Sequence, residues 1–128
     1  MITVEQQHNG IEALYAVSHW LLEQGKFRDA ASLLRNMVQI APADERGWLA
    51  LGVCHEQAEQ AEIALEMYGT GAVLSASSAR CQLARARLLR AAGELSDAED
   101  ALDAAAEAAV EEPELLDLIE RERERDPR

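Results

Sequence analysis

The sequence is poor in the residues that build disulfide frameworks, sharp turns and aromatic cores. It contains only two cysteines and three prolines, and 4% of its 128 residues are aromatic. Cys54 and Cys81 form no CxxC motif, which excludes a disulfide-rich scaffold and fits a reducing compartment. Few β-branched residues, set against 24 alanines and many Leu, Glu, Arg and Gln, predict an all-α fold.

Basic side chains and long apolar runs are also scarce. The chain has 12 Lys and Arg against 24 Asp and Glu, a net charge of −12, which excludes nucleic acid as a partner. The excess of acidic residues is concentrated at one end of the chain, since residues 1–93 carry a net charge of −2 and residues 94–128 a net charge of −10. The start of the chain has no signal-peptide pattern, and no apolar run is long enough for a membrane span. We therefore expect a cytoplasmic protein with no stable membrane insertion.

The chain repeats itself every 34 residues. Four sets of three positions keep this interval, one member in each copy. The sets are Gly25, Glu59 and Gly93; Phe27, Ala61 and Leu95; Ala30, Ala64 and Ala98; and Leu34, Tyr68 and Leu102. Fixed periods of this length are typical of helical repeat proteins. We expect a short N-terminal arm over residues 1–10, three copies over 11–44, 45–78 and 79–112, and an acidic C-terminal capping helix over 113–128.

Each copy has the pattern of two helices joined by a tight turn. In the first copy, amphipathic segments over 11–23 and 27–40 flank the turn at Gly25. A glycine after a helix suits the left-handed conformation of a C-terminal turn. Glu59 replaces this glycine in the middle copy, so we expect that turn to close differently. In the capping helix, the apolar residues expected to cover the last copy are Leu115, Leu118 and Ile119.

The middle copy matches the tetratricopeptide signature. It reads Trp48-x-x-Leu51-Gly52-x-x-His55, followed by Ala64-x-x-x-Tyr68. Small residues at these positions let two helices approach closely, and we expect Gly69 and Gly71 to do the same within the second helix. The predicted fold is a short right-handed solenoid of three helix-turn-helix repeats, closed by the capping helix.

The first helices of such a solenoid line its concave side, and the helical period selects their inward residues. The candidate groove residues are Tyr15, His19, Leu22, Arg46, Leu49, Val53, Arg80, Leu83 and Arg87. Glu12, Glu56 and Arg90 complete the same stripes. An apolar centre with a charged rim suits an extended peptide, whose carbonyls or acidic groups the arginines could hold.

Two simpler interpretations of these residues stay open. Tyr15 and Leu49 could merely complete the core of their own repeats. The arginines could form a solvated face that pairs with the acidic end of the chain.

No constellation of residues points to chemistry. The histidines and cysteines lack the spacing of a zinc site, and the Gly69-Thr70-Gly71 segment lacks the rest of a phosphate loop. His19 and Glu23 are spaced as a surface pair on one helix, and His55 occupies an aromatic position of the repeat. We predict no catalytic residues, no metal site and no cofactor.

Several segments resemble the class II chaperones of type III secretion systems. They are Glu12-Ala-Leu-Tyr15, Gln24-Gly-Lys-Phe27-Arg-Asp-Ala30, Leu49-Ala-Leu-Gly-Val-Cys54, Tyr68-Gly-Thr-Gly-Ala-Val73 and Gly93-Glu-Leu-Ser-Asp-Ala-Glu99. The resemblance implies a binding module that holds an extended segment of a hydrophobic translocator, or another secreted client, in its concave groove. It also implies that Tyr15 and Phe27 contact the client, that Leu49 lines a pocket, and that the chain can form a homodimer.

Three other functions remain in competition. A needle-subunit co-chaperone of the same system would hold a long helix in the groove. A general tetratricopeptide adaptor would bind folded proteins or free C-termini. An enzyme is the least supported.

Overall fold

The computed structural model describes residues 1–125, so the last three positions of the expected capping helix lie outside the described residues. Over this range the chain forms seven helices and no strand, as the composition predicts. They are α1 (Val4–Glu23), α2 (Phe27–Ile40), α3 (Glu45–Gln57), α4 (Ala61–Leu74), α5 (Ala79–Ala91), α6 (Leu95–Ala108) and α7 (Pro113–Glu124). Within residues 1–125, no helix is both long and apolar enough to cross a membrane.

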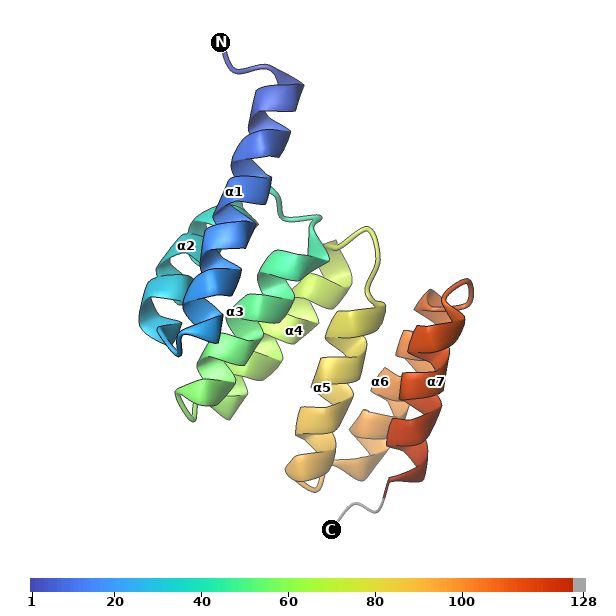
Figure 1. Cartoon of the computed structure of the whole chain (residues 1–128). Helices are drawn as coiled ribbons and strands as arrows, with labels where there is room; N and C mark the ends of the chain where they lie inside the picture. Colours follow the sequence, from blue (N-terminus) through green and yellow to red (C-terminus); the bar gives the residue numbers. More distant parts are fainter. Residues whose placement is uncertain (126–128) are drawn as a thin grey trace.

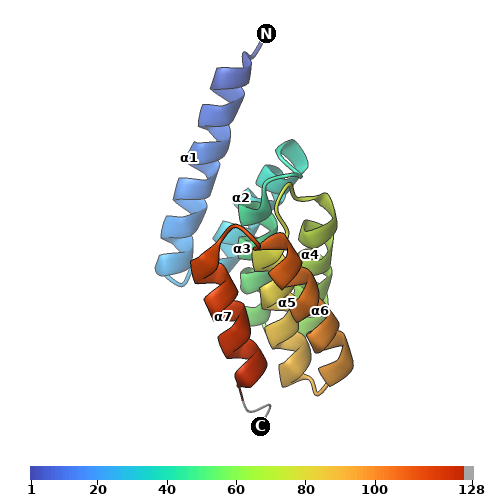
Figure 2. The ribbon, with the colours of Figure 1, turned by 90° about the vertical axis from the view of Figure 1, so that its right-hand side faces the viewer.

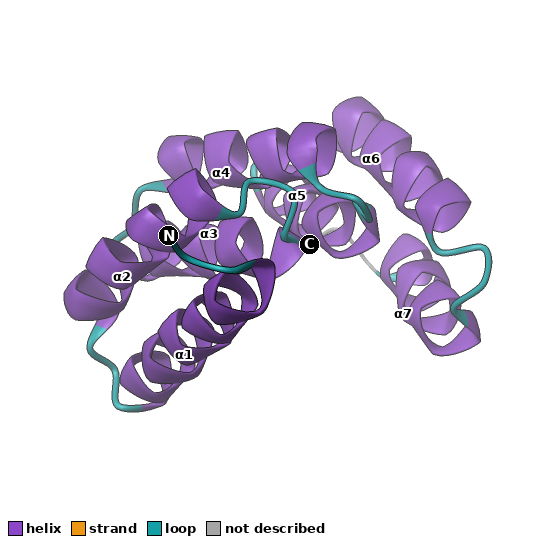
Figure 3. Cartoon of the chain, turned by 90° about the horizontal axis from the view of Figure 1, so that it is seen from above, coloured by secondary structure: helices purple, strands orange, loops and turns teal. Residues whose placement is uncertain are grey.

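The helices stack as antiparallel pairs in a curved, two-layered array (Figure 1). The first six helices pack most closely as α1 with α2, α3 with α4, and α5 with α6. Seen from above, α1, α3, α5 and α7 form an inner row and α2, α4 and α6 an outer row (Figure 3). The inner row lines the concave side, where the groove residues were predicted.

Helix α1 starts seven residues earlier than the expected start at Ile11. Thr3 and Gln6 form a capping box, in which each side chain accepts a hydrogen bond from the other residue's backbone N–H. Most of the expected arm over residues 1–10 is therefore helical, and it projects past the other helices (Figure 2). All ten of its residues are exposed, which is why the amphipathic pattern begins only at Ile11.

Contacts too close for a larger residue set the spacing of the helix pairs. A Cβ atom added to Gly52 of α3 would overlap the ring of the fully buried Tyr68 on α4. One added to Gly71 would lie 2.5 Å from Trp48 Cβ and 2.7 Å from Cys81 Sγ. Gly71 therefore fulfils the packing role expected of it, whereas Gly69 has open space around its Cα. The expectation for Gly69 is wrong because its position on α4 faces no neighbouring helix.

The two ends of the array have separate cores. The first two copies share one buried cluster, in which Leu34 and Met37 are fully buried. A second cluster joins the third copy to α7 through Leu115 and Ile119. Leu118, which we expected to cover the third copy as well, is 44% exposed. It lies off the buried face, which continues from Ile119 to Glu122 instead.

The three turns inside the copies share one geometry, which corrects the expectation for Glu59. Gly25 and Gly93 have φ values of +74° and +82°, and Glu59 takes the same left-handed conformation at +59°. In the middle copy, the N–H groups of Glu59 and Gln60 donate to the carbonyls of Glu56 and His55 at 3.0 and 2.9 Å. This pair of bonds forms a Schellman motif, which also closes the other two turns.

The two glycines of α4 provide a matched test of the close packing. We expect Gly71→Ala to lower the free energy of unfolding by about 1–3 kcal/mol, because Trp48 and Cys81 must move. Gly69→Ala should raise it by about 0.5–1 kcal/mol, because alanine favours the helix and meets no neighbour. Urea unfolding of both variants measures the difference, and equal effects would contradict the packing role of Gly71.

The left-handed turn at Glu59 predicts that a substitution can stabilise the protein. Glu59→Gly should raise the free energy of unfolding by about 1 kcal/mol, because a side chain at positive φ is strained. The control Glu62→Gly, in the first turn of α4, should lower it by about 0.5–1 kcal/mol. The midpoints of urea unfolding measure both changes, provided that the dependence of the unfolding free energy on urea stays the same. A destabilised Glu59→Gly variant would contradict the strain at Glu59.

Candidate functional site

The first two copies present an apolar stripe on the concave side that the chain itself leaves partly open. Tyr15 and Leu22 of α1 and Leu49 and Val53 of α3 are all half-buried. Tyr15 and Leu22 also pack against the core of the first two copies, as the simpler interpretation of Tyr15 expected. Each still keeps part of its side chain exposed, so the stripe offers apolar surface to a partner.

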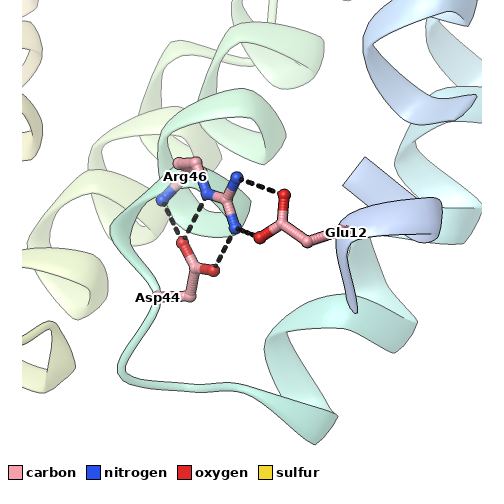
Figure 4. Close-up of polar contacts among 3 residues, drawn as sticks. All are labelled: Glu12, Asp44 and Arg46. Atoms are coloured by element: carbon pink, nitrogen blue, oxygen red, sulfur yellow. Dashed lines mark hydrogen bonds and ion pairs between the residues drawn. The ribbon is translucent and has the colours of Figure 1, made fainter. Parts of the chain in front are cut away.

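A charged network joins the first two copies at the rim of this stripe (Figure 4). The guanidinium of Arg46 donates to both carboxylate oxygens of Glu12, at 3.1 and 2.6 Å. It also donates to both carboxylate oxygens of Asp44, at 3.0 and 2.8 Å. Asp44 in addition caps α3 by accepting from the backbone N–H of Arg46 at 3.1 Å. These bonds hold Arg46 between two carboxylates that flank it from α1 and from the loop before α3.

The same arginine fixes the ring of Tyr15. Its Cζ lies 4.5 Å from the centroid of that ring, within range of a cation–π contact. His19 stacks along α1 with a centroid distance of 6.0 Å from Tyr15. His19 also lies 2.8 Å from Glu23, with both side chains more than half exposed, which confirms the expected surface pair. Tyr15 is thus held between Arg46 and His19 on the concave side.

The hydrogen bonds of Arg46 leave it little capacity for a ligand, since its Nε, Nη1 and Nη2 all donate to Glu12 or Asp44. Hydrogen bonds from Arg46 lower the pKa of Glu12 and of Asp44, so both carboxylates stay ionised near neutral pH. The same hydrogen bonds raise the pKa of Arg46. Two negative charges therefore surround one positive charge, and the cluster is acidic overall. Arg46 acts as a support for Tyr15 in this structure.

In the third copy, helix α7 covers the residues that correspond to this stripe. Leu83 is buried in the cluster shared with α7. Arg80 donates to Glu112 at 2.9 Å, and Arg87 donates to the buried Glu122 at 2.9 Å. Arg90 donates to the backbone carbonyl of Glu122 at 2.8 Å, near the C-terminal end of α7. These pairings agree with the simpler interpretation of the arginine stripe, in which it faces the acidic end of the chain.

A buried carboxylate links the second and third copies. Glu45 on α3 accepts a hydrogen bond from the backbone N–H of Cys81 at 2.8 Å and so caps the first turn of α5. Burial raises the pKa of Glu45, and burial together with the Glu45 charge raises the pKa of the Cys81 thiol to about 12. Cys81 is therefore an unreactive core residue.

Phe27 and His55 lie away from the stripe, in a cleft between α2 and α3. His55 fills no aromatic pocket, because its ring is part-exposed and its Nδ1 lies 2.8 Å from Gln60 Oε1. Among residues 1–125, no group of three His, Cys, Asp or Glu side chains could hold a metal ion.

Comparison with known proteins places this geometry in a family. A tetratricopeptide repeat model matches residues 21–72. Low calcium response locus protein H of Yersinia pseudotuberculosis is 30% identical over 87% of this chain, which spans 66% of that relative's length. The type III secretion translocator chaperone SycD of Yersinia enterocolitica, solved with a peptide of the translocator YopD, is also 30% identical. Its TM-score is 0.77, over 88% of this chain and 86% of SycD. The chain belongs to the tetratricopeptide chaperones of type III secretion translocators.

A second chaperone of the family supports the same assignment. PcrH, solved in complex with the chaperone binding region of PopD, is 27% identical with a TM-score of 0.76. The similarity covers 89% of this chain and 86% of PcrH. The family resemblance and the all-α tetratricopeptide fold predicted from the sequence are confirmed.

The structure adds to the predicted groove the carboxylates that pair with its arginines. Sequence reasoning missed Asp44, Glu45 and Glu122 as functional neighbours. One signal was available for the first network, because Glu12 and Arg46 are one 34-residue period apart and equivalent positions of adjacent copies are neighbours. Glu122 could not be located this way, because α7 follows the repeats and does not share their period.

The Arg46 network predicts lowered pKa values of Glu12 and Asp44, which NMR of the carboxyl carbons can measure. In Arg46→Gln, the pKa of Glu12 should rise to its ordinary range, and that of Asp44 should rise partly, because Asp44 still accepts a backbone N–H. The network's stabilisation is present above the ordinary values of 4.5 and 3.8 and is lost as the pH falls through the depressed folded-state values. Glu45 is the control, since burial sets its pKa and the substitution should leave it unchanged. Unshifted carboxylates in the variant would contradict the network.

Proposed function

We propose that this protein is a cytoplasmic chaperone of a type III secretion system. It binds an extended apolar segment of a hydrophobic translocator on its concave side and keeps that client soluble and competent for secretion. The observation that carries the proposal is the half-open stripe of Tyr15, Leu22, Leu49 and Val53, on a fold shared with chaperones solved with translocator segments.

The open stripe has the chemistry that such a client requires. Translocators enter membranes, so they expose apolar side chains that would otherwise associate in water. Burial of an apolar side chain in the groove contributes about 1.5–3 kcal/mol. The Arg46 network holds Tyr15 in place before the client arrives, which lowers the entropic cost of binding.

The charge of the chain supports the solubilising role. A net charge of −12 gives a chaperone–client complex a strong mutual repulsion, which opposes aggregation. The proposal assigns no catalytic step to any residue. It includes a homodimer, because one SycD structure is described as an alternative dimer. Light scattering of the free and client-bound protein measures that state.

Co-expression with a translocator tests the proposal. We expect the translocator subunits of the same genome to be insoluble alone and to co-purify with the tagged chaperone. Leu49→Glu should weaken this binding at least about tenfold, because an apolar contact is replaced by a charge that must be desolvated. Tyr15→Ala should weaken it about tenfold through loss of the anchor.

Val73→Glu is the matched control for Leu49→Glu. Val73 is 82% exposed on the outer-row helix α4, so the same gain of charge there should leave client binding unchanged. A translocator that still co-purifies with Leu49→Glu would overturn the groove assignment. Recovery of only a needle subunit, or of only folded soluble proteins, would support the co-chaperone or the adaptor instead.

A further inference from the structure

The cleft between α2 and α3 is a second apolar surface, built from different residues than the concave stripe. It has a volume of about 250 Å³, and its apolar lining comes from Phe27 and Ala31 of α2 and from Cys54 and Ala58 at the end of α3. Phe27 is the only phenylalanine of the chain. Helix α2, which contributes Phe27 and Ala31 to the cleft, belongs to the outer row of helices (Figure 3).

The charges around this cleft run against the charge of the whole chain. Arg28 and Arg35 line it together with His55, and none of its lining residues is acidic. Within residues 1–125, neither arginine has a carboxylate within ion-pair distance. The stripe arginines Arg46, Arg80 and Arg87 are each paired with a carboxylate. In a chain of net charge −12, two unpaired arginines beside one apolar cleft form a local basic site.

The geometry of the cleft sets the chemistry of a ligand. An arginine without a partner can accept a carboxylate in a bidentate pair, and the apolar lining can take a small aliphatic or aromatic side chain. Arg28 and Arg35 are seven residues apart on α2, or about 10.5 Å along the helix axis. Carboxylates about three residues apart in an extended peptide span a similar distance.

We propose that the α2–α3 cleft binds an acidic segment of a partner protein. An apolar side chain of the segment enters beside Phe27 and Ala31, and carboxylates on either side pair with Arg28 and Arg35. The lining of the cleft includes none of the stripe residues Tyr15, Leu22, Leu49 and Val53.

The test uses the full chain, labelled with ¹⁵N, and two short synthetic peptides. One peptide carries a leucine between glutamates three residues apart, and the other has glutamine in place of each glutamate. We expect the acidic peptide to shift the amide signals of Ala31, Cys54 and Ala58, and to bind more weakly as salt is raised. The glutamine peptide should bind at least about tenfold more weakly, because it lacks the charge-assisted pairs.

A pair of charge-matched variants separates a specific site from general attraction. Arg35→Gln should weaken the acidic peptide at least about fivefold. Arg121→Gln removes the same charge from an exposed pair on α7 and should leave the binding unchanged. Circular dichroism and the Tm verify that both variants fold.

Three results would overturn the proposal. The first is equal weakening by the two variants, and the second is the absence of any shift in the cleft. The third is a shift along Tyr15, Leu49 and Val53, which would place the peptide in the concave groove. Binding of translocators is not an input to this test, so the cleft and the proposed chaperone function can fail separately.

Discussion

The close contact between Gly52 and the ring of Tyr68 sets the geometry on which the rest of the molecule depends. It brings α3 and α4 together at a distance that no larger residue at position 52 would allow. One period before and one period after Gly52 stand Ser18 and Ala86, which are also small and fully buried. Because the copies repeat with a constant period, side chains one period apart become neighbours along the concave side. Glu12 and Arg46 meet for this reason, and their pairing in turn holds Tyr15.

Arginines in this acidic chain have distinct roles that depend on their surroundings. On the inner row, Arg46, Arg80 and Arg87 are neutralised by carboxylates of the same chain. In the first two copies, the pairing of Arg46 with Glu12 and Asp44 leaves a stripe whose half-buried residues are mainly apolar. On α2, Arg28 and Arg35 keep their charge available. The molecule thus separates an apolar surface from a basic one, and a single chain can present both at once.

The repeat period made the fold readable from the sequence, since it located every helix pair and the small residues between the helices. The pattern could not show a backbone conformation that the residue type disfavours. Glu59 is the example, because it takes the left-handed conformation that glycine takes in the other two turns. The pattern also missed the capping box at Thr3, because the first turns of α1 bury nothing and leave no amphipathic trace. Of the predicted groove residues, Tyr15, Leu49 and Val53 are half-buried on inner-row helices, while Phe27 lines another cleft. Pairings with α7 were beyond reach, because that helix lies outside the repeat.

The covering of the third copy by α7 has a consequence for the order in which the molecule matures. A ribosome makes the chain from its N-terminus, and folding of early segments begins during synthesis. Helix α5 therefore emerges with Leu83 and its arginines facing water, well before Leu115, Ile119 and Glu122 exist to cover them. The nascent chaperone passes through a stage in which its concave apolar surface is longer than in the finished molecule. Completion of α7 shortens that surface to the two copies left open, so a helix translated after the three repeats defines the length of the groove.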